Sequence, residues 1–137
     1  MKDRVNQMVK KREEFRPFAQ SVAAEAADDF FELRSRLQYE HMTIAVRAKA
    51  ERATEIPAVV HVNGTARVHV VRREVNPRYW ELLTRFGQVT NIPVLLNTSF
   101  NVKGEAIVCT REDAIRCFLG TGIDHLAIEG YLLSKSE

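Results

Sequence analysis

The sequence predicts an α/β fold of the mixed α+β kind, a twisted mixed sheet with helices packed on it. Short apolar segments typical of strands alternate with segments whose apolar residues recur at helical spacing. Two of the strand-like segments flank Asn63-Gly64, a strong hairpin turn, so at least one strand pair should be antiparallel. The 137 residues suffice for about one domain with a buried core, and we find no repeat, low-complexity segment or internal domain boundary.

The composition is that of a soluble globular protein, with 45% hydrophobic and 28% charged residues. No apolar run approaches the roughly 20 residues that a membrane helix needs, and the first residues form a polar pattern instead of a signal-peptide core. Cys109 and Cys117 are the two cysteines, and their spacing predicts neither a disulfide framework nor a zinc site. We therefore expect a cytoplasmic protein that does not enter a membrane. The net charge of +2 is compatible with nucleic acid or with a small anionic ligand.

The first half of the chain is expected to alternate between helices and strands. In chain order we expect a helix (1–14), a strand (18–23), a helix (24–33), a strand (42–48), a polar connection (49–56) and the two hairpin strands (58–62 and 65–73).

The second half carries clearer signals for where helices begin. Asn76 and Pro77 predict a helix start, and Gly87 is expected to end that helix. The spacing from Thr110 to Asp113 predicts a capping box, which begins a helix that runs to Leu119. The buried stripe of the first helix is expected to be Tyr79, Leu82, Leu83 and Phe86, and strands are expected at 92–96, 106–109, 125–128 and 131–133.

A polar loop follows the strand at 92–96, which is apolar enough to be buried on both faces. Asn97, Ser99 and Asn101 alternate, so an extended chain would point all three side chains the same way, with Lys103 adding a positive charge. Ligands of α/β proteins bind beyond strand ends of this kind. The alternative is an ordinary loop whose side chains bond their own backbone, and the local pattern favours neither interpretation.

Basic residues lie at several strand ends: Arg12, Arg16, Arg72, Arg73 and Lys103. If these strand ends gather at one rim of the sheet, the side chains could surround a polyanion, since the arginine fork binds phosphate oxygens in pairs. Adjacent strand residues face opposite ways, so at most one residue of the Arg72-Arg73 pair should enter a pocket directly. The alternative for this pair is a solvated strand end.

The sequence offers no recognisable nucleophile or metal motif. His61 and His69 should face opposite sides of the hairpin, so they cannot form a two-histidine metal site there, and structural histidines are the simpler interpretation. Neither a Ser/His/Asp arrangement nor a Walker loop can be identified from spacing. A catalytic role would therefore depend on positioning and neutralising phosphates.

Several motifs occur together in a fixed order along the whole chain: Lys11-Arg12-Glu13-Glu14-Phe15-Arg16-Pro17-Phe18-Ala19, Val71-Arg72-Arg73, Asn76-Pro77-Arg78-Tyr79-Trp80, Pro93 to Asn101, Lys103-Gly104-Glu105 and Gly120-Thr121-Gly122. In combination they resemble the C-terminal domain of the nodulation and antibiotic O-carbamoyltransferases. The resemblance implies a YrdC-like fold with a basic concave cavity. It also implies that the family's metal-binding N-terminal domain is absent from these 137 residues, which then contain no metal site.

The resemblance further implies that the domain binds ATP, with Mg²⁺, and carbamoyl phosphate to form carbamoyl adenylate. The carbamoyl group then passes to an acceptor hydroxyl on the N-terminal domain, so full activity is not expected from this chain alone. Arg16 and Arg72 would hold phosphates, supported by Arg12, Arg73 and Lys103, while Asn97, Ser99 and Asn101 would bind ATP as a Ser-x-Asn type loop. Two alternatives stand beside this: an RNA-binding module of the same fold, and a non-catalytic interaction domain that forms a homodimer.

Overall fold

The computed structural model describes residues 1–11 and 18–136. The chain forms two compact units, one within 17–98 and the other within 1–16 and 99–137. From the sequence we expected no internal domain boundary, and this stays a prediction. Within the described residues, the C-terminal strands pair with each other and not with the main sheet. Among the described residues, no helix has the length and apolar character needed to cross a membrane.

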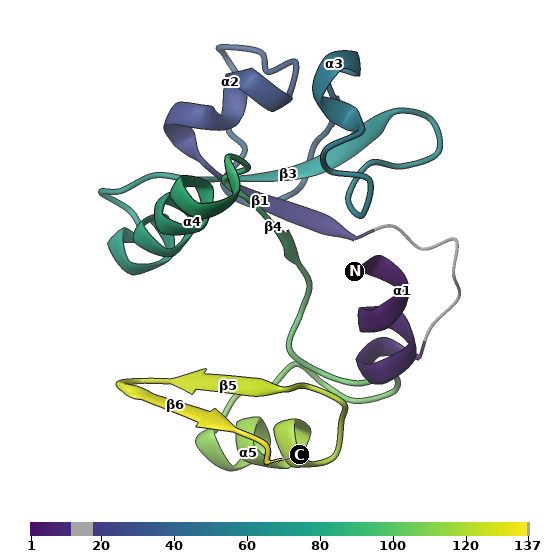
Figure 1. Cartoon of the computed structure of the whole chain (residues 1–137), viewed down its shortest axis with the longest axis vertical. Helices are drawn as coiled ribbons and strands as arrows, with labels where there is room; N and C mark the ends of the chain where they lie inside the picture. Colours follow the sequence, from purple (N-terminus) through teal and green to yellow (C-terminus); the bar gives the residue numbers. More distant parts are fainter. Residues whose placement is uncertain (12–17, 137) are drawn as a thin grey trace. The chain divides into compact units, whose positions relative to one another are not determined.

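The larger unit is built on a four-stranded mixed sheet in the order β2-β3-β1-β4. Figure 1 labels β1, β3 and β4 of this sheet. Its strands are β1 (Ala19–Ala23), β2 (Ala45–Arg47), β3 (Thr65–Val71) and β4 (Val94–Asn97). β1 runs parallel to β3 and antiparallel to β4, and β2 runs antiparallel to β3. The predicted mixed α/β class is therefore confirmed. Every residue of β1 is buried, because β1 has a strand on each side and side chains packed on both faces.

The two faces of this sheet contact different elements, because alternate strand residues point in opposite directions. Val22 and Val68 belong to a core that includes Phe30 and Phe31, contributed by the segment that contains η2 (Ala24–Ala26) and α2 (Ala27–Phe30). Ala23 and Val71 face the other way and pack against Leu83 of helix α4 (Pro77–Thr90). The sheet thus has helices on both sides (Figure 1).

The expected hairpin around Asn63-Gly64 is not formed. Gly64 has φ +76° and the His61 amide donates to the Thr65 carbonyl, so the turn exists, but residues 58–62 are not a strand. β3 pairs instead with β2 on one side and β1 on the other. Ile56 and Val59 are buried in the core as loop residues, which explains the apolar run that resembled a strand.

Helix α4 begins as predicted and ends later. Asn76 is its N-cap, accepting from the Tyr79 amide, and Pro77 is its first residue. The helix continues through Gly87 to a left-handed C-cap at Asn91, with φ 60°. A Cβ on Gly87 would lie 2.7 Å from the Cβ of Pro93, so glycine is needed here for close approach and not to end the helix.

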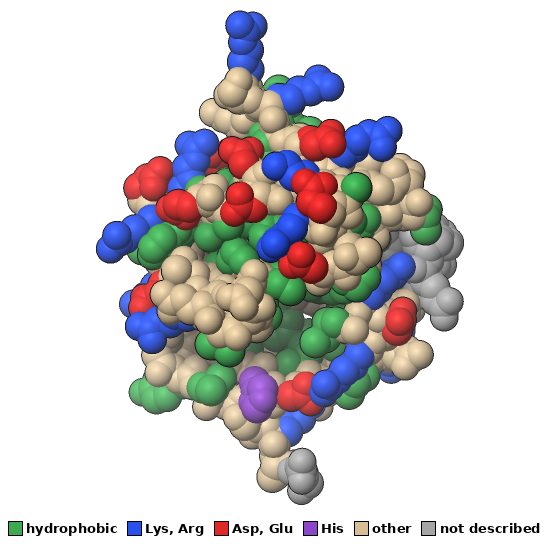
Figure 2. Space-filling view, turned by 45° about the horizontal axis from the view of Figure 1, so that its top comes forward, with side chains coloured by type: hydrophobic (Ala, Val, Ile, Leu, Met, Phe, Trp, Pro, Cys, Tyr) green, Lys and Arg blue, Asp and Glu red, His purple; other side chains and the backbone are tan. Residues whose placement is uncertain are grey.

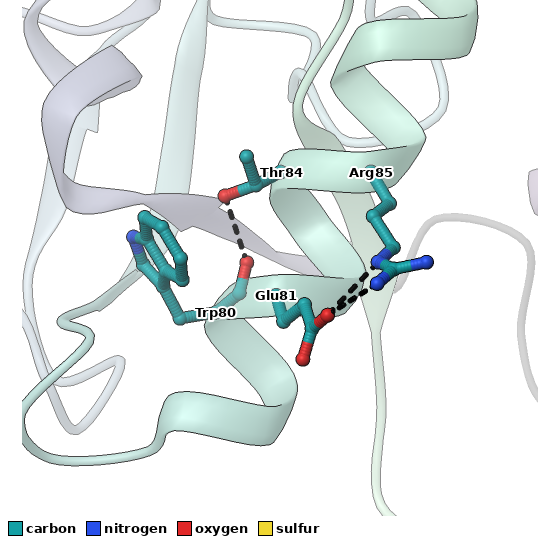
Figure 3. Close-up of polar contacts among 4 residues, drawn as sticks. All are labelled: Trp80, Glu81, Thr84 and Arg85. Atoms are coloured by element: carbon teal, nitrogen blue, oxygen red, sulfur yellow. Dashed lines mark hydrogen bonds and ion pairs between the residues drawn. The ribbon is translucent and has the colours of Figure 1, made fainter.

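The predicted buried stripe of α4 was half wrong. Leu83 is fully buried, but Leu82 and Phe86 are exposed, and Trp80 packs toward the sheet in their place. The Trp80 indole donates to Glu25 at 2.8 Å, which ties α4 to η2. Figure 3 shows Trp80 on one side of the helix and the Arg85–Glu81 ion pair on the other.

Other elements differ from expectation mainly in length. The helix expected at 24–33 ends at Phe30, because Phe31 forms an isolated bridge with Ala48. The connection expected at 49–56 contains the short helix α3 (Ala50–Ala53). The N-terminal helix expected at 1–14 is described as α1 (Lys2–Val5) followed by the π-helix η1 (Asn6–Lys10).

The smaller unit combines these N-terminal helices with α5 (Arg111–Leu119) and the antiparallel pair β5 (His125–Ile128) and β6 (Tyr131–Ser134). The predicted capping box at Thr110 is confirmed, with hydrogen bonds in both directions to Asp113. Residues 106–109, expected to be a buried strand, are irregular and mostly exposed, because no neighbouring strand pairs with them. Phe118 and Leu126 lie in a separate small core.

Candidate functional site

The loop after β4 is divided between the two units, and its polar residues form two clusters. Asn97 ends β4 in the larger unit, whereas Ser99 and Asn101 belong to the smaller unit. We call Lys10, Ser99 and Asn101 the lysine cluster, and Ser21, His69 and Asn97 the serine–histidine cluster. Ser99 and Asn101 thus have their side-chain partners in the smaller unit, and Asn97 has its side-chain partners in the larger unit. That the three side chains serve one ligand stays a prediction.

The lysine cluster surrounds a buried ammonium group. Lys10 is the last residue of η1 and is 5% exposed. Its Nζ donates to Ser99 Oγ at 3.1 Å, Asn101 Oδ1 at 2.8 Å and the Asn101 carbonyl at 2.9 Å, and it also contacts the Ser99 carbonyl. A buried charge is tolerated only when several acceptors replace its water shell. The ammonium thus fixes the shape of the loop around it.

The loop side chains of this cluster also bond one another. Ser99 Oγ donates to Asn101 Oδ1 at 2.6 Å, and Asn101 Nδ2 donates to the Glu105 carbonyl at 2.9 Å. Lys103 is exposed in the turn that contains Gly104, whose φ is +85°. Ser99 and Asn101 therefore converge as their alternation predicted, and the cation they surround is Lys10.

The serine–histidine cluster lies on the face of the sheet that α4 covers. Strand register places Ser21 opposite His69 and places Asn97 opposite Ala19. Ser21 Oγ lies 3.0 Å from His69 Nδ1, and Asn97 Nδ2 donates to Ser21 Oγ at 2.8 Å. The Tyr79 ring of α4 lies 6.1 Å from the His69 ring, centroid to centroid.

The environment of His69 favours its neutral form. Burial lowers the pKa of His69 below its usual 6.5, the nearby charge of His41 lowers it further, and Glu40 raises it. The imidazole is therefore uncharged at neutral pH, and one ring nitrogen is free of a proton and can accept a hydrogen bond.

Arg72 and Arg73 lie at the other end of the sheet from Asn97. Asn97 pairs with Ala19 and Val71 pairs with Ala23, so more than about 13 Å of strand separates Arg72 from Asn97, at about 3.3 Å per residue. The polyanion site was predicted on the condition that the strand ends gather at one rim of the sheet. Within the larger unit this condition is not met. The reason is that β4 is antiparallel to β1 and β3, so its C-terminal end meets their N-terminal ends.

The two arginines already have protein partners. Arg72 is half exposed, lines a cavity of about 280 Å³ and pairs with Glu40 at 3.1 Å. Arg73 lies over the Trp80 ring at 5.2 Å. They have different neighbours, although neither is a strand residue, because β3 ends at Val71 and not at Arg73 as expected. The other two arginines predicted for the site, Arg12 and Arg16, lie outside the described residues.

Charge on the surface is mixed. The cavity beside Arg72 also contains Asp28 and Glu40, and on the face drawn in Figure 2 basic and acidic side chains are interspersed. No single basic patch covers that face, so it gives no support to the RNA-binding alternative. Within residues 1–11 and 18–136 no three histidine, cysteine or acidic side chains are grouped as metal ligands.

Sequence reasoning missed Lys10, Ser21 and His69. Lys10 lies in a run of basic residues. No local sequence feature distinguishes its side chain, which is buried, from that of its neighbour Lys11, which is exposed. His69 was correctly placed on the strand face opposite Val68 and Val70, which alternation could show. Its serine partner is 48 residues away, and spacing cannot reveal such a pair.

Comparison with known proteins identifies the family. A family model described as "Carbamoyltransferase C-terminus" matches residues 1–135. The chain belongs to this family. It is 46% identical over 135 residues to nodulation protein NolNO of Sinorhizobium fredii, covering 98% of this chain and 20% of that relative. It is 44% identical to nodulation protein NolO of Bradyrhizobium diazoefficiens, with 98% and 25% covered.

An uncharacterized protein of Synechocystis sp. is also similar, at 41% identity over 154 residues, 99% of this chain and 25% of the relative. This carbamoyltransferase C-terminal chain therefore spans about a fifth to a quarter of the length of these relatives. The matches to these relatives cover 98–99% of the chain.

Proposed function

We propose that this carbamoyltransferase C-terminal chain binds ATP, with Mg²⁺, and carbamoyl phosphate, and that it supports formation of carbamoyl adenylate. The carbamoyl group would then pass to an acceptor hydroxyl held by a metal-binding N-terminal domain of the same family. The observation that carries the proposal is the lysine cluster, in which a buried cation lies within a Ser-x-Asn loop. Forming carbamoyl adenylate from carbamoyl phosphate, ATP and water releases both phosphate and pyrophosphate, so the site must neutralise several negative charges.

The basic residues would share this task in two groups. Lys10 would bind a phosphate oxygen, which takes the place of one of the loop oxygens that now contact its ammonium. Arg12 and Arg16 follow Lys10 closely in the sequence and would add forked contacts to the same phosphates. We assign Asn97, Ser99, Asn101 and Lys103 to ATP.

Arg72 and Arg73 would contribute from the far end of the sheet. Arg72 can bind a phosphate only after it separates from Glu40. The Arg72 side chain is 50% exposed and the Glu40 side chain is 18% exposed, and ion pairs open to solvent contribute only about 0–1 kcal/mol. An incoming phosphate can therefore compete with Glu40 for the guanidinium. Arg73 would act as an outer support while stacked on Trp80.

The proposal is tested by calorimetric titration with MgATP, with and without carbamoyl phosphate. Lys10→Ala should weaken binding by about 1.5–3 kcal/mol, the usual loss for a hydrogen bond to a charged group. Lys11→Ala is the matched control, because Lys11 is adjacent and exposed. Arg16→Ala and Arg72→Ala should each weaken binding by a similar amount. Unchanged affinity in the folded Lys10→Ala protein would refute the assignment of the lysine cluster.

A further inference from the structure

We infer that Asn97 presents its side-chain oxygen to an N–H or O–H group of the bound substrate, and that Ser21 and His69 hold it in this orientation. The inference rests on the proposed function and specifies what Asn97 recognises. An amide oxygen can only accept hydrogen bonds, so its ligand must supply a donor. A fully ionised phosphate has none. The carbamoyl NH₂ group, the adenine amino group and the ribose hydroxyls each have one.

The orientation of Asn97 follows from how hydrogens are distributed in the serine–histidine cluster. Asn97 Nδ2 donates to Ser21 Oγ at 2.8 Å and also lies 3.4 Å from His69 Nδ1. Ser21 Oγ and His69 Nδ1 lie 3.0 Å apart, and the tautomer of His69 decides which of the two donates. Our inference assigns the neutral ring with its proton on Nε2, so that the single hydrogen of the serine hydroxyl points to Nδ1. The amide nitrogen of Asn97 is thus used inside the protein.

The amide oxygen of Asn97 remains available. No hydrogen bond is given to Oδ1 by the residues that the structure describes, and Oδ1 is not among their buried unpartnered atoms. Asn97 itself is only half-buried. Ser21 is fully buried, so water cannot replace it as the partner of the amide nitrogen. The amide nitrogen of Asn97 thus has its hydrogen-bond partner inside the protein, and the amide oxygen can accept a hydrogen bond from a ligand.

Protonation of His69 would reverse this arrangement. The groups that face the ring are Ser21 from β1, Asn97 from β4, Tyr79 from α4, and the charged or titratable pair Glu40 and His41. With a proton on Nδ1, the ring donates to Ser21, Ser21 donates to Asn97, and Asn97 must turn its oxygen inward. The side chain then presents NH₂ outward, and its preference for a donor is lost.

The hydrogen-bond directions in the serine–histidine cluster are tested without any ligand, by measuring the His69 tautomer with long-range ¹H–¹⁵N NMR. The expected result at neutral pH is a proton on Nε2 and an unprotonated Nδ1, with the Nδ1 resonance shifted in Ser21→Ala. His69→Gln identifies the signals. A proton on Nδ1 at neutral pH, or an Nδ1 signal unaffected by Ser21→Ala in a folded protein, would overturn the inference.

The ligand group is identified by calorimetry with analogues that each lack one donor. Acetyl phosphate replaces carbamoyl phosphate, inosine triphosphate lacks the adenine amino group, and 2′-deoxy-ATP and 3′-deoxy-ATP each lack one ribose hydroxyl. The wild-type chain should bind one of these analogues roughly 2- to 12-fold more weakly than its parent ligand, the effect of one neutral hydrogen bond. In Asn97→Ala that discrimination should disappear, and in Ser21→Ala it should decrease.

The possible results separate the inference from the proposed function. If Asn97→Ala weakens the binding of every analogue and of its parent ligand by the same factor, Asn97 does not accept a hydrogen bond from the group that the analogue lacks. The inference is then wrong. If the wild-type chain binds neither ATP nor carbamoyl phosphate, the proposed function fails together with the recognition of a substrate donor. The tautomer measurement then decides the orientation of Asn97 alone.

Discussion

The two polar clusters hold their asparagine side chains by different physical means. In the smaller unit, Asn101 is one of several acceptors around a buried charge, and the Lys10 ammonium determines where each oxygen lies. In the larger unit, Asn97 belongs to a neutral chain whose geometry is set by strand register. A charge can organise an irregular loop because its acceptors can approach from any direction. A neutral chain of donors and acceptors needs a rigid scaffold such as β1.

The comparison predicts that the two units respond separately to core substitutions. Phe30→Ala should lower the free energy of unfolding by about 3–5 kcal/mol, because a fully buried ring leaves a cavity. Urea unfolding measures the loss, and hydrogen exchange should show it in β1 and β3. Phe86→Ala, at a partly exposed position, is the control. Equal loss of protection in α5 would show that the two units unfold as one.

Removing the buried charge tests the lysine cluster directly. Lys10→Met keeps a similar length but leaves the oxygens of Ser99 and Asn101 without their cation, so stability should fall by about 1–3 kcal/mol. Amide exchange in residues 99–105 should accelerate, while β1 and β4 stay protected. Lys11→Met should change stability little. A loop unaffected by Lys10→Met would mean that the charge does not organise it.

Gly87→Ala tests the close approach behind α4. Alanine favours a helix over glycine by about 1 kcal/mol, but its Cβ would lie 2.7 Å from Pro93 Cβ, and overpacking costs about 1–3 kcal/mol. We expect a net loss of stability in thermal unfolding. Gln88→Ala, one residue later and exposed, should be neutral or slightly stabilising. A more stable Gly87→Ala protein would show that Pro93 can move aside.

The α5 capping box offers a smaller effect. Thr110→Ala should cost about 1 kcal/mol, whereas Thr110→Ser should retain most of the stability. The hydrogen bond from Thr110 lowers the pKa of Asp113 below its usual 3.8, so this contribution is present above that pH and is lost as the pH falls through the lower folded value. An NMR titration should find the pKa of Asp113 closer to 3.8 in Thr110→Ala. An unchanged pKa would assign the shift to another group.

The smallest effect expected is the pH dependence that His69 contributes. Its pKa is lowered in the folded state, so the unfolded chain takes up a proton first and stability falls as the pH drops below about 6.5. Above that pH, His69 does not contribute to the pH dependence of the free energy of unfolding. His69→Gln should flatten the part of the curve below about pH 6.5 in urea unfolding. His125→Gln, in the smaller unit, is the control. Identical slopes in wild type and His69→Gln would contradict the lowered pKa.

The sequence by itself determined the features that depend on neighbouring residues. The N-cap at Asn76, the first-turn proline at Pro77 and the capping box at Thr110 were predictable because the side chain and the amide it caps are a few residues apart. The mixed α/β class and the closing strands β5 and β6 followed from apolar periodicity. The ordered motifs also gave the carbamoyltransferase C-terminal family.

Only the tertiary structure decided which segments pair and which polar groups meet. β3 pairs with β1 and β2 and not across its own turn, and Arg72 lies far from Asn97 because β4 is antiparallel. Lys10 meets Ser99 across 89 residues, and Asn97 meets Ser21 across 76. The local sequence pattern indicates which face of a strand a residue occupies. Which side chain of another strand it contacts on that face depends on burial and on strand register. Those depend on the whole chain, because each buried polar group must find its partner among residues distant in sequence.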